Sequence, residues 1–364
     1  ILIDADSGKV LKSRNAHQRL APASMTKLMT MLLALEAIDE GTAHKTDQVT
    51  SSEYAASMDG TRIYLEPGEM MTLDDMLKAM ALASANDASV AVAEHLAGSE
   101  KAFVEQMNRK AQDLGMKDTY FKNVSGMPTE GHYSSAYDMA LLAKYTLAHT
   151  SITDYTSLKQ DALRDGEFPI YNSNRLLWCY PGTDGLKTGY TSEAKNCLTA
   201  TAKRGKLRLI TVVMGCPFRG GHTQAAMSLL DYGFDHYSCK TLMAKSTVCG
   251  TVKVKGGTAK EVPAVVPDEV NAICLNSSRG NLTRSQDLLP HVKAPVESGQ
   301  KVGEMLIFDE GKLLKRVDLR AGADIPRLTL AGRILHMPWG FKILIILIMT
   351  ITYLRHRNSS GDNS

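Results

Sequence analysis

The sequence predicts a mixed α/β protein of the α+β kind, with one antiparallel sheet flanked by helices and a small all-β domain after it. Three observations support this class: strand pairs at the N-terminus and near residue 200, helical patterning between them, and short alternating runs beyond residue 240. At 364 residues the chain exceeds the roughly 250 residues at which one hydrophobic core stops growing. We therefore expect at least two domains.

The helices of the first half follow from apolar periodicity and capping signals. We expect an apolar helix over residues 24–40. A second helix begins at Thr72, where Thr-Leu-Asp-Asp forms a capping box, and it breaks over residues 84–89 before apolar helix resumes. Further helices are expected over about 100–114 and from Ser135 onward.

The strands of the predicted sheet come from both ends of this region. The opening ILIDADSGKVL predicts two strands around an Asp-Ser-Gly turn. Residues 196–203 and 207–215 predict a hairpin joined by Arg-Gly-Lys, with a helix after it up to Phe234. The strand pairs from the two ends of the region therefore form one antiparallel sheet with helices on its faces.

The C-terminal region contains the run WGFKILIILIMTITYL, followed directly by Arg355-His356-Arg357. Its uninterrupted apolar part is shorter than the ~20 residues of a spanning helix, although the preceding aromatic residues and lysine extend it. We interpret the run as a membrane anchor; the alternative is a core helix of the second domain. The basic residues after it predict a cytoplasmic tail, with the rest of the chain outside the membrane. The expected order is catalytic domain 1–238, β-sandwich domain 239–326, linker 327–338, anchor 339–354 and tail 355–364.

Composition excludes several classes of function. The net charge of +3 is too small to indicate nucleic-acid binding. The six cysteines all lie beyond residue 178 and form no CxxC or Cys/His spacing, so we expect no metal site, and their disulfide pairing stays open. No motif indicates a cofactor. The chain opens directly on a strand, so we expect an export signal to be missing from the sequence.

Three short polar motifs occur in a fixed order. Ser24 and Lys27 lie one helical turn apart at the start of the most apolar predicted helix, so that hydroxyl and amine share a face. Ser84-Ala85-Asn86 lies in the break between two helices, and Lys187-Thr188-Gly189 lies where a strand begins. Each motif alone is common: a helix cap with a surface lysine, a polar loop and a strand end are the ordinary interpretations. Together, in this order, they indicate one active site.

With these motifs the chain resembles the low-molecular-mass penicillin-binding proteins that act as serine-type D-alanyl-D-alanine carboxypeptidases. The resemblance extends to NAHQRLAPASMTKLMT, GLKTGYT and LLDYGF, covers residues 1 to about 235 strongly and continues weakly through the β domain. It implies the penicillin-binding and serine β-lactamase-like fold. It also implies stem peptides of peptidoglycan ending in D-Ala-D-Ala as substrates, β-lactams as covalent inhibitors, and a site on the outer face of the bacterial cytoplasmic membrane.

The chemistry assigns a role to each catalytic candidate. A serine hydroxyl becomes a nucleophile when a base takes its proton, and Lys27 can be that base for Ser24 only if it is neutral. Burial and the nearby cation Lys187 would lower its pKa. The resemblance implies that Ser84 relays a proton to the leaving D-alanine, and that Asn86 binds the peptide and orients the lysine.

The resemblance also implies the substrate-binding groups. The backbone amides of Ser24 and Tyr190 are expected to stabilise the developing oxyanion. Lys187, with Thr188 and Thr191 on either side of Gly189, is expected to bind the terminal carboxylate of the substrate.

The sequence departs from the family pattern in two places. Where the family carries an arginine before the last helix of this region, the chain has His222, and Arg219 three residues earlier is the candidate replacement. Where a glycine is common after the Lys-Thr-Gly strand, the chain has Lys195-Asn196. The first departure bears on carboxylate binding.

Two rival functions stay open at this stage. A serine β-lactamase shares the fold and motifs but needs a carboxylate that activates the deacylating water, for which Glu130 is the candidate. A non-catalytic wall-binding protein of the same fold is favoured only by the missing arginine at position 222.

Overall fold

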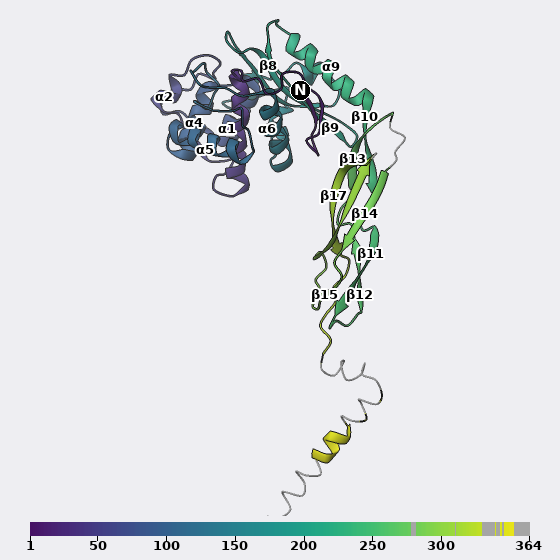
Figure 1. Cartoon of the computed structure of the whole chain (residues 1–364). Coiled ribbons are helices and arrows are strands. Elements are labelled where there is room, and N and C mark those ends of the chain that lie inside the picture. Colours follow the sequence, from purple (N-terminus) through teal and green to yellow (C-terminus); the bar gives the residue numbers. More distant parts are fainter. Residues whose placement is uncertain (278–281, 310, 330–338, 340–342, 344–345, 353–364) are drawn as a thin grey trace, which may run out of the picture. The chain divides into compact units, whose positions relative to one another are not determined.

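The computed structural model describes residues 1–277, 282–309, 311–329, 339, 343 and 346–352. Figure 1 shows the whole chain, which divides into two compact units. Unit 1 comprises Ile1–Cys239 and Ile273–Ser277, and unit 2 comprises Lys240–Ala272 and the residues from 278 onward. Each unit has a hydrophobic core of its own.

The sheet of unit 1 has five strands in the order β2-β1-β9-β8-β7, and every neighbouring pair is antiparallel. The predicted antiparallel sheet and its hairpin are confirmed. Strand β7 is an edge strand, so one side of its backbone has no neighbouring strand within this sheet. The strands are β1 (Leu2–Asp4), β2 (Val10–Lys12), β7 (Thr183–Thr191), β8 (Lys195–Arg204) and β9 (Leu207–Cys216).

Helices cover both faces of this sheet, as the alternation of buried residues shows. Ile3 and Ile210 belong to the core beneath α1 and α6, whereas Leu2 and Leu209 belong to the core beneath α9. Successive residues of a strand point to opposite faces, so the two helical layers lie on opposite sides. The helices are η1 (Ala23–Thr26), α1 (Lys27–Asp39), α2 (Glu53–Ala56), α3 (Leu73–Lys78), η2 (Ala79–Ala83), α4 (Asn86–Ala97), α5 (Glu100–Asp113), α6 (Ala136–His149), α7 (Thr153–Thr156), α8 (Leu176–Cys179) and α9 (Gly221–His236). Two short strand pairs accompany them: β3 (Gln48–Thr50) with β4 (Met70–Thr72), and β5 (Gln160–Leu163) with β6 (Phe168–Tyr171).

The predicted helix over 24–40 is present but begins differently. Its first turn is the 3-10 helix η1, and the α-helix starts only at Lys27. Ala23 has φ +48°, and a Cβ on Gly126 would lie 1.8 Å from the Ala23 carbonyl oxygen. Ala23, the first residue of η1, thus lies in the left-handed region with Gly126 packed against its carbonyl, a conformation outside the α-helical region.

The second predicted helix begins at Thr72, as expected, because the Thr72 hydroxyl accepts a hydrogen bond from the Asp75 amide at 3.1 Å. The predicted break over 84–89 is too long. Helix α3 first widens into a π-helical turn, η2, and Ser84 takes φ +60°, but α4 already starts at Asn86. Two first-turn amides of α4 have acceptors outside the helix ladder: the Asn86 amide donates to the Thr61 carbonyl oxygen at 2.7 Å, and the Ala88 amide donates to the Asp87 carboxylate at 2.9 Å.

Unit 2 is an all-β domain, which confirms the predicted class of this region. A six-stranded sheet has the order β14-β16-β17-β12-β11-β15, and β10 pairs with β13. Alternating residues such as Val252 and Val262 form its core. Its strands are β11 (Val248–Lys255), β12 (Glu261–Val265), β14 (Leu282–Leu288), β15 (Val292–Lys293), β16 (Lys301–Asp309) and β17 (Lys312–Ala321), whereas β10 (Tyr237–Met243) and β13 (Val270–Leu275) each have residues in both units.

Of the predicted anchor, 339–354, the structure describes 339, 343 and 346–352; the rest lies outside the described residues, as do the tail and the linker after Thr329. Residues 346–352 are helical and exposed. Within the part of the chain that the structure describes, no helix is long and apolar enough to span a bilayer.

The Lys195 departure has a conformational consequence that can be measured. Lys195 pairs with Thr191 at the end of the β7–β8 hairpin and has φ +57°, which suits glycine. We expect Lys195→Gly to be more stable than Lys195→Ala by about 1 kcal/mol, because only glycine adopts this conformation without steric cost. Urea unfolding of the two variants, which both lack the lysine side chain, isolates the backbone effect. Equal midpoints and slopes would contradict the prediction.

Candidate active site

The first motif forms a serine–lysine pair at the start of α1. The Lys27 Nζ donates a hydrogen bond to the Ser24 Oγ at 3.1 Å, and the lysine side chain is completely buried. Ser24 lies in the 3-10 turn and Lys27 opens the α-helix, so the change of helix type occurs between the two groups. The structure thus brings a hydroxyl to the amine of a lysine enclosed in apolar surroundings.

Asn86 and a backbone carbonyl complete the surroundings of the lysine. The Lys27 Nζ also donates to the Asn86 Oδ1 at 2.6 Å and to the Ser125 carbonyl oxygen at 2.7 Å. The Asn86 Nδ2 donates to the Asp59 carbonyl oxygen at 2.6 Å. Because the amide nitrogen has its own acceptor, the oxygen is fixed toward Lys27.

Hydrogen bonds to Thr61, in the loop between α2 and β4, hold the backbone of the second motif. Ser84 is 9% exposed, and its carbonyl oxygen accepts a hydrogen bond from the Thr61 hydroxyl at 2.9 Å. The Asn86 amide in turn donates to the Thr61 carbonyl oxygen at 2.7 Å. Ser84 therefore lies at a sharp bend two residues before Asn86, in a conformation that strains any residue except glycine.

Two buried lysines share this site. Burial lowers the pKa of Lys27 well below its usual value, the positive charge of Lys187 lowers it further, and the carboxylate of Asp87 opposes the shift. Lys187 is 1% exposed, and burial lowers its pKa to about 7. The environment of Lys27 thus favours the neutral amine that a general base requires.

The third motif brings the edge strand β7 against the serine. A Cβ on Gly189 would lie 2.9 Å from the Pro22 carbonyl oxygen and 3.1 Å from the Ser24 nitrogen, so only glycine allows this approach. The Thr188 hydroxyl is hydrogen-bonded to the Ser173 hydroxyl. The amide of Tyr190 follows directly on the same strand, where the resemblance placed the second oxyanion donor.

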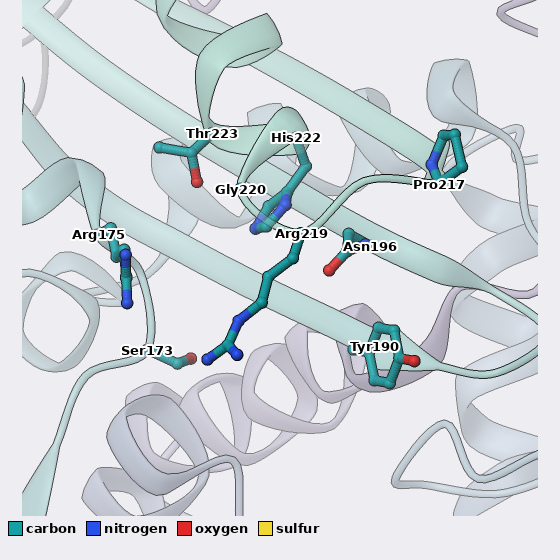
Figure 2. A pocket seen from close by; sticks show the side chains of 9 residues that line it. All are labelled: Ser173, Arg175, Tyr190, Asn196, Pro217, Arg219, Gly220, His222 and Thr223. Atoms are coloured by element: carbon teal, nitrogen blue, oxygen red, sulfur yellow. The ribbon is translucent and has the colours of Figure 1, made fainter.

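A pocket of about 850 Å³ lies next to this strand. Figure 2 shows the Arg219 side chain extending toward Ser173, with His222 behind it at the start of α9. The His222 Nδ1 is buried without a hydrogen-bond partner among the described residues, and burial lowers the pKa of the imidazole. The lining residues are Ser173, Arg175, Tyr190, Asn196, Pro217, Arg219, Gly220, His222 and Thr223.

The structure connects some of the predicted site residues by hydrogen bonds and others only through a shared pocket. Hydrogen bonds connect Ser24, Lys27 and Asn86, whereas Arg219 and His222 share a pocket with Tyr190. Two other candidates are engaged elsewhere. The Thr191 hydroxyl accepts a hydrogen bond from the Ala194 amide in the hairpin turn, and the exposed Glu130 lines a different cavity beside Lys195.

Sequence analysis missed two groups of this site. The buried Asp87 carboxylate accepts hydrogen bonds from the amides of Ile63 and Leu65 and acts electrostatically on Lys27. An acid in the first turn of a predicted helix was a signal that could have found it. The Ser125 carbonyl had no such signal, since every residue carries a backbone carbonyl.

A serine hydroxyl beside a buried lysine amine, with a second lysine and a glycine-bearing edge strand, defines a serine enzyme of acyl transfer. Comparison with known proteins agrees. Residues 1–217 match the family model described as D-alanyl-D-alanine carboxypeptidase, and residues 237–327 match the C-terminal domain of penicillin-binding protein 5. The chain belongs to the D-alanyl-D-alanine carboxypeptidase family of serine peptidases.

Individual relatives cover nearly the whole chain. D-alanyl-D-alanine carboxypeptidase DacF of Bacillus subtilis is 44% identical over 90% of this chain and 85% of its own length. DacA of Escherichia coli is 32% identical over 92% of this chain and 85% of its own. Among solved structures, penicillin-binding protein 5 of Haemophilus influenzae is 30% identical with a TM-score of 0.77, covering 90% of this chain and 96% of that one.

The burial of Lys187 makes a prediction about stability and pH. Burial lowers the pKa of Lys187 from 10.5, the value expected in the unfolded chain, to about 7 in the folded protein. Between these two pH values the unfolded chain therefore binds a proton that the folded protein does not. Stability therefore rises with pH across this window, by at most about 1.4 kcal/mol per pH unit for one proton. We expect Lys187→Met to be more stable than the wild type at pH 7.5, with a gain that shrinks toward pH 10.

Urea unfolding at several pH values tests this expectation. Lys203→Met, at an exposed lysine of the neighbouring strand β8, is the matched control and should keep the wild-type slope. A Lys187→Met variant with the same pH dependence as the wild type would mean that Lys187 keeps its proton in the folded protein.

Proposed function

We propose that this protein removes the terminal D-alanine from peptidoglycan stem peptides through an acyl-enzyme on Ser24, and that β-lactams acylate the same hydroxyl. The observation that carries this proposal is the fully buried Lys27 amine 3.1 Å from the Ser24 Oγ. Membership of the D-alanyl-D-alanine carboxypeptidase family supports the choice of substrate.

Acylation begins with proton transfer from Ser24 to neutral Lys27. The hydroxyl oxygen attacks the carbonyl carbon of the penultimate D-alanine, and negative charge develops on the carbonyl oxygen. The amides of Ser24 and Tyr190 are the proposed donors to it, and the close approach at Gly189 supports their convergence. Donors fixed before the reaction stabilise this charge without reorganisation.

Collapse of the intermediate breaks the peptide C–N bond. Ser84 relays the proton of Lys27 to the nitrogen of the departing D-alanine, which therefore leaves as a neutral amine. Water then attacks the ester with Lys27 as base, and the Ser24 hydroxyl is restored. Asn86 orients the lysine through its Oδ1.

The carboxylate of the leaving D-alanine binds beside the Thr188 hydroxyl, with Lys187 behind it. Arg219 supplies the permanent positive charge that the family places at position 222. The position of its side chain near Ser173, whose hydroxyl is bonded to Thr188, supports this role (Figure 2). His222 provides only a neutral imidazole near pH 7.

The rival functions gain no support. A β-lactamase needs a carboxylate at the deacylating water, and Glu130 lies exposed in a separate cavity. A non-catalytic protein has no need of a buried lysine at a serine hydroxyl, because the burial of an amine costs stability.

We also propose that the chain acts on the outer face of the cytoplasmic membrane, anchored by residues 339–354. The apolar run and the basic residues 355–357 after it support this orientation. Outside the membrane the active site would meet the cell wall directly.

The catalytic proposal is tested by the release of D-alanine from diacetyl-L-Lys-D-Ala-D-Ala and by mass spectrometry of the penicillin adduct. We expect the wild type to show both activities, and Ser24→Ala to show neither. Lys27→Met should lose at least about 1,000-fold in kcat/KM, because the nucleophile and its base act as a unit. A folded wild type that releases no D-alanine and binds no penicillin would contradict the proposal, as would penicillin hydrolysis faster than adduct accumulation.

The role of Arg219 is tested with a pair of substrates that differ only in the terminal group. We expect Arg219→Ala to lower kcat/KM about 10- to 100-fold for the peptide with a free carboxylate, the loss of one charge-assisted contact. The peptide ending in an amide should be affected less than threefold. Arg219→Ala/His222→Arg should recover part of the loss, and Arg109→Ala on α5 is the control. An equal loss for both peptides would mean that Arg219 acts on structure and not on the carboxylate.

A further inference from the structure

The pocket beside β7 contains more positive charge than one carboxylate requires. Arg175 enters it from the turn before α8, and Arg219 enters it from the loop between β9 and α9 (Figure 2). None of the described residues that line the pocket is acidic. Neither guanidinium forms an ion pair within the part of the chain that the structure describes. Two like charges in one cavity repel each other, and an anion between them relieves this cost.

The pocket is also larger than an alanine leaving group needs. Its volume of about 850 Å³ lies within the range of roughly 300–1,000 Å³ in which proteins enclose ligands of many atoms. His222 contributes to this space, because an imidazole is shorter than the arginine side chain that the family pattern places there. The substitution at 222 therefore opens the pocket as well as removing a charge.

The position of the pocket connects it to the leaving group and not to the acyl group. Ser173 lines the pocket, and its hydroxyl is bonded to Thr188, the proposed contact of the terminal carboxylate. A substrate carboxylate bound at Thr188 therefore has this pocket next to it, with room for a side chain on the last residue. Arg175, which lines the same pocket, is then available to bind a charged group on that side chain.

We infer that this enzyme also accepts peptides whose last residue, after D-alanine, is a larger acidic D-residue, and that Arg175 binds the side-chain carboxylate of that residue. The inference rests on the proposed function, since it uses the same acyl-enzyme. The bond between the D-alanine carbonyl carbon and the next nitrogen breaks as the Ser24 ester forms, the amine leaves with the relayed proton, and water hydrolyses the ester. Arg219 holds the main-chain carboxylate of the acidic residue as it holds that of D-alanine.

Three peptides separate charge from size: diacetyl-L-Lys-D-Ala followed by D-Ala, D-Glu or D-Gln. D-Glu and D-Gln have nearly the same shape and differ in charge. We expect the wild type to cleave the D-Glu peptide with a kcat/KM about 5- to 10-fold above that of the D-Gln peptide at low salt, as for one charge-assisted contact at a partly open site. The ratio should fall as ionic strength rises.

Variants assign the effect to Arg175. Arg175→Ala should bring the D-Glu to D-Gln ratio to about one while the D-Ala-D-Ala peptide keeps its rate within twofold. Its side chain is exposed and forms no hydrogen bond or ion pair with the residues that the structure describes, so the fold does not depend on it, and the penicillin adduct verifies a competent site. Arg109→Ala removes the same charge from α5 and should leave the ratio unchanged.

Each failure has its own meaning. A wild type that releases D-alanine but cleaves the D-Gln peptide as well as the D-Glu peptide would overturn the inference and leave the carboxypeptidase function intact. A preference for D-Glu that survives Arg175→Ala would overturn the assignment of Arg175. Loss of all three reactions together with the penicillin adduct would refute the proposed function itself.

Discussion

The structure depends on burying one amine next to one hydroxyl. Lys27 is fully enclosed by α1 and its neighbours, and each of its hydrogen bonds goes to a neutral acceptor: Ser24, Asn86 or the carbonyl of Ser125. An amine can be buried this way at tolerable cost only if its proton is easily lost. The same burial that destabilises the fold therefore produces the base that catalysis requires.

Close approach of backbones makes this enclosure possible. Gly126 packs against the carbonyl of Ala23, and Gly189 brings β7 to the amide of Ser24. Both glycines pack against the same short turn, in which Ala23 takes a left-handed conformation. Strain of this kind persists only where surrounding contacts determine the backbone, and here those contacts come from segments about 100 and 165 residues away along the chain.

That distance explains what the sequence could and could not predict. The three motifs, the antiparallel sheet and the cap at Thr72 depend on residue type at short spacing, and each was predicted from that spacing. The 3-10 turn at Ala23, the π turn before Ser84 and the Ser125 acceptor depend on packing between distant segments. Asp87 belongs partly to each group. Its position in the first turn of a helix was predictable from the sequence, but its electrostatic effect on Lys27 depends on the fold.

The same electrostatics explain why carboxylate binding needs a cation other than Lys187. With a pKa of about 7, Lys187 is only partly charged near neutral pH, and its charge also acts on Lys27. A guanidinium keeps its proton at any physiological pH, so it binds a carboxylate without changing the state of the base. Arg219 is exposed in the loop between β9 and α9, so an arginine at this position occupies no place in the helix. If Arg219 in that loop binds the carboxylate as we propose, the charge of the substrate is separated from the proton chemistry of the two lysines.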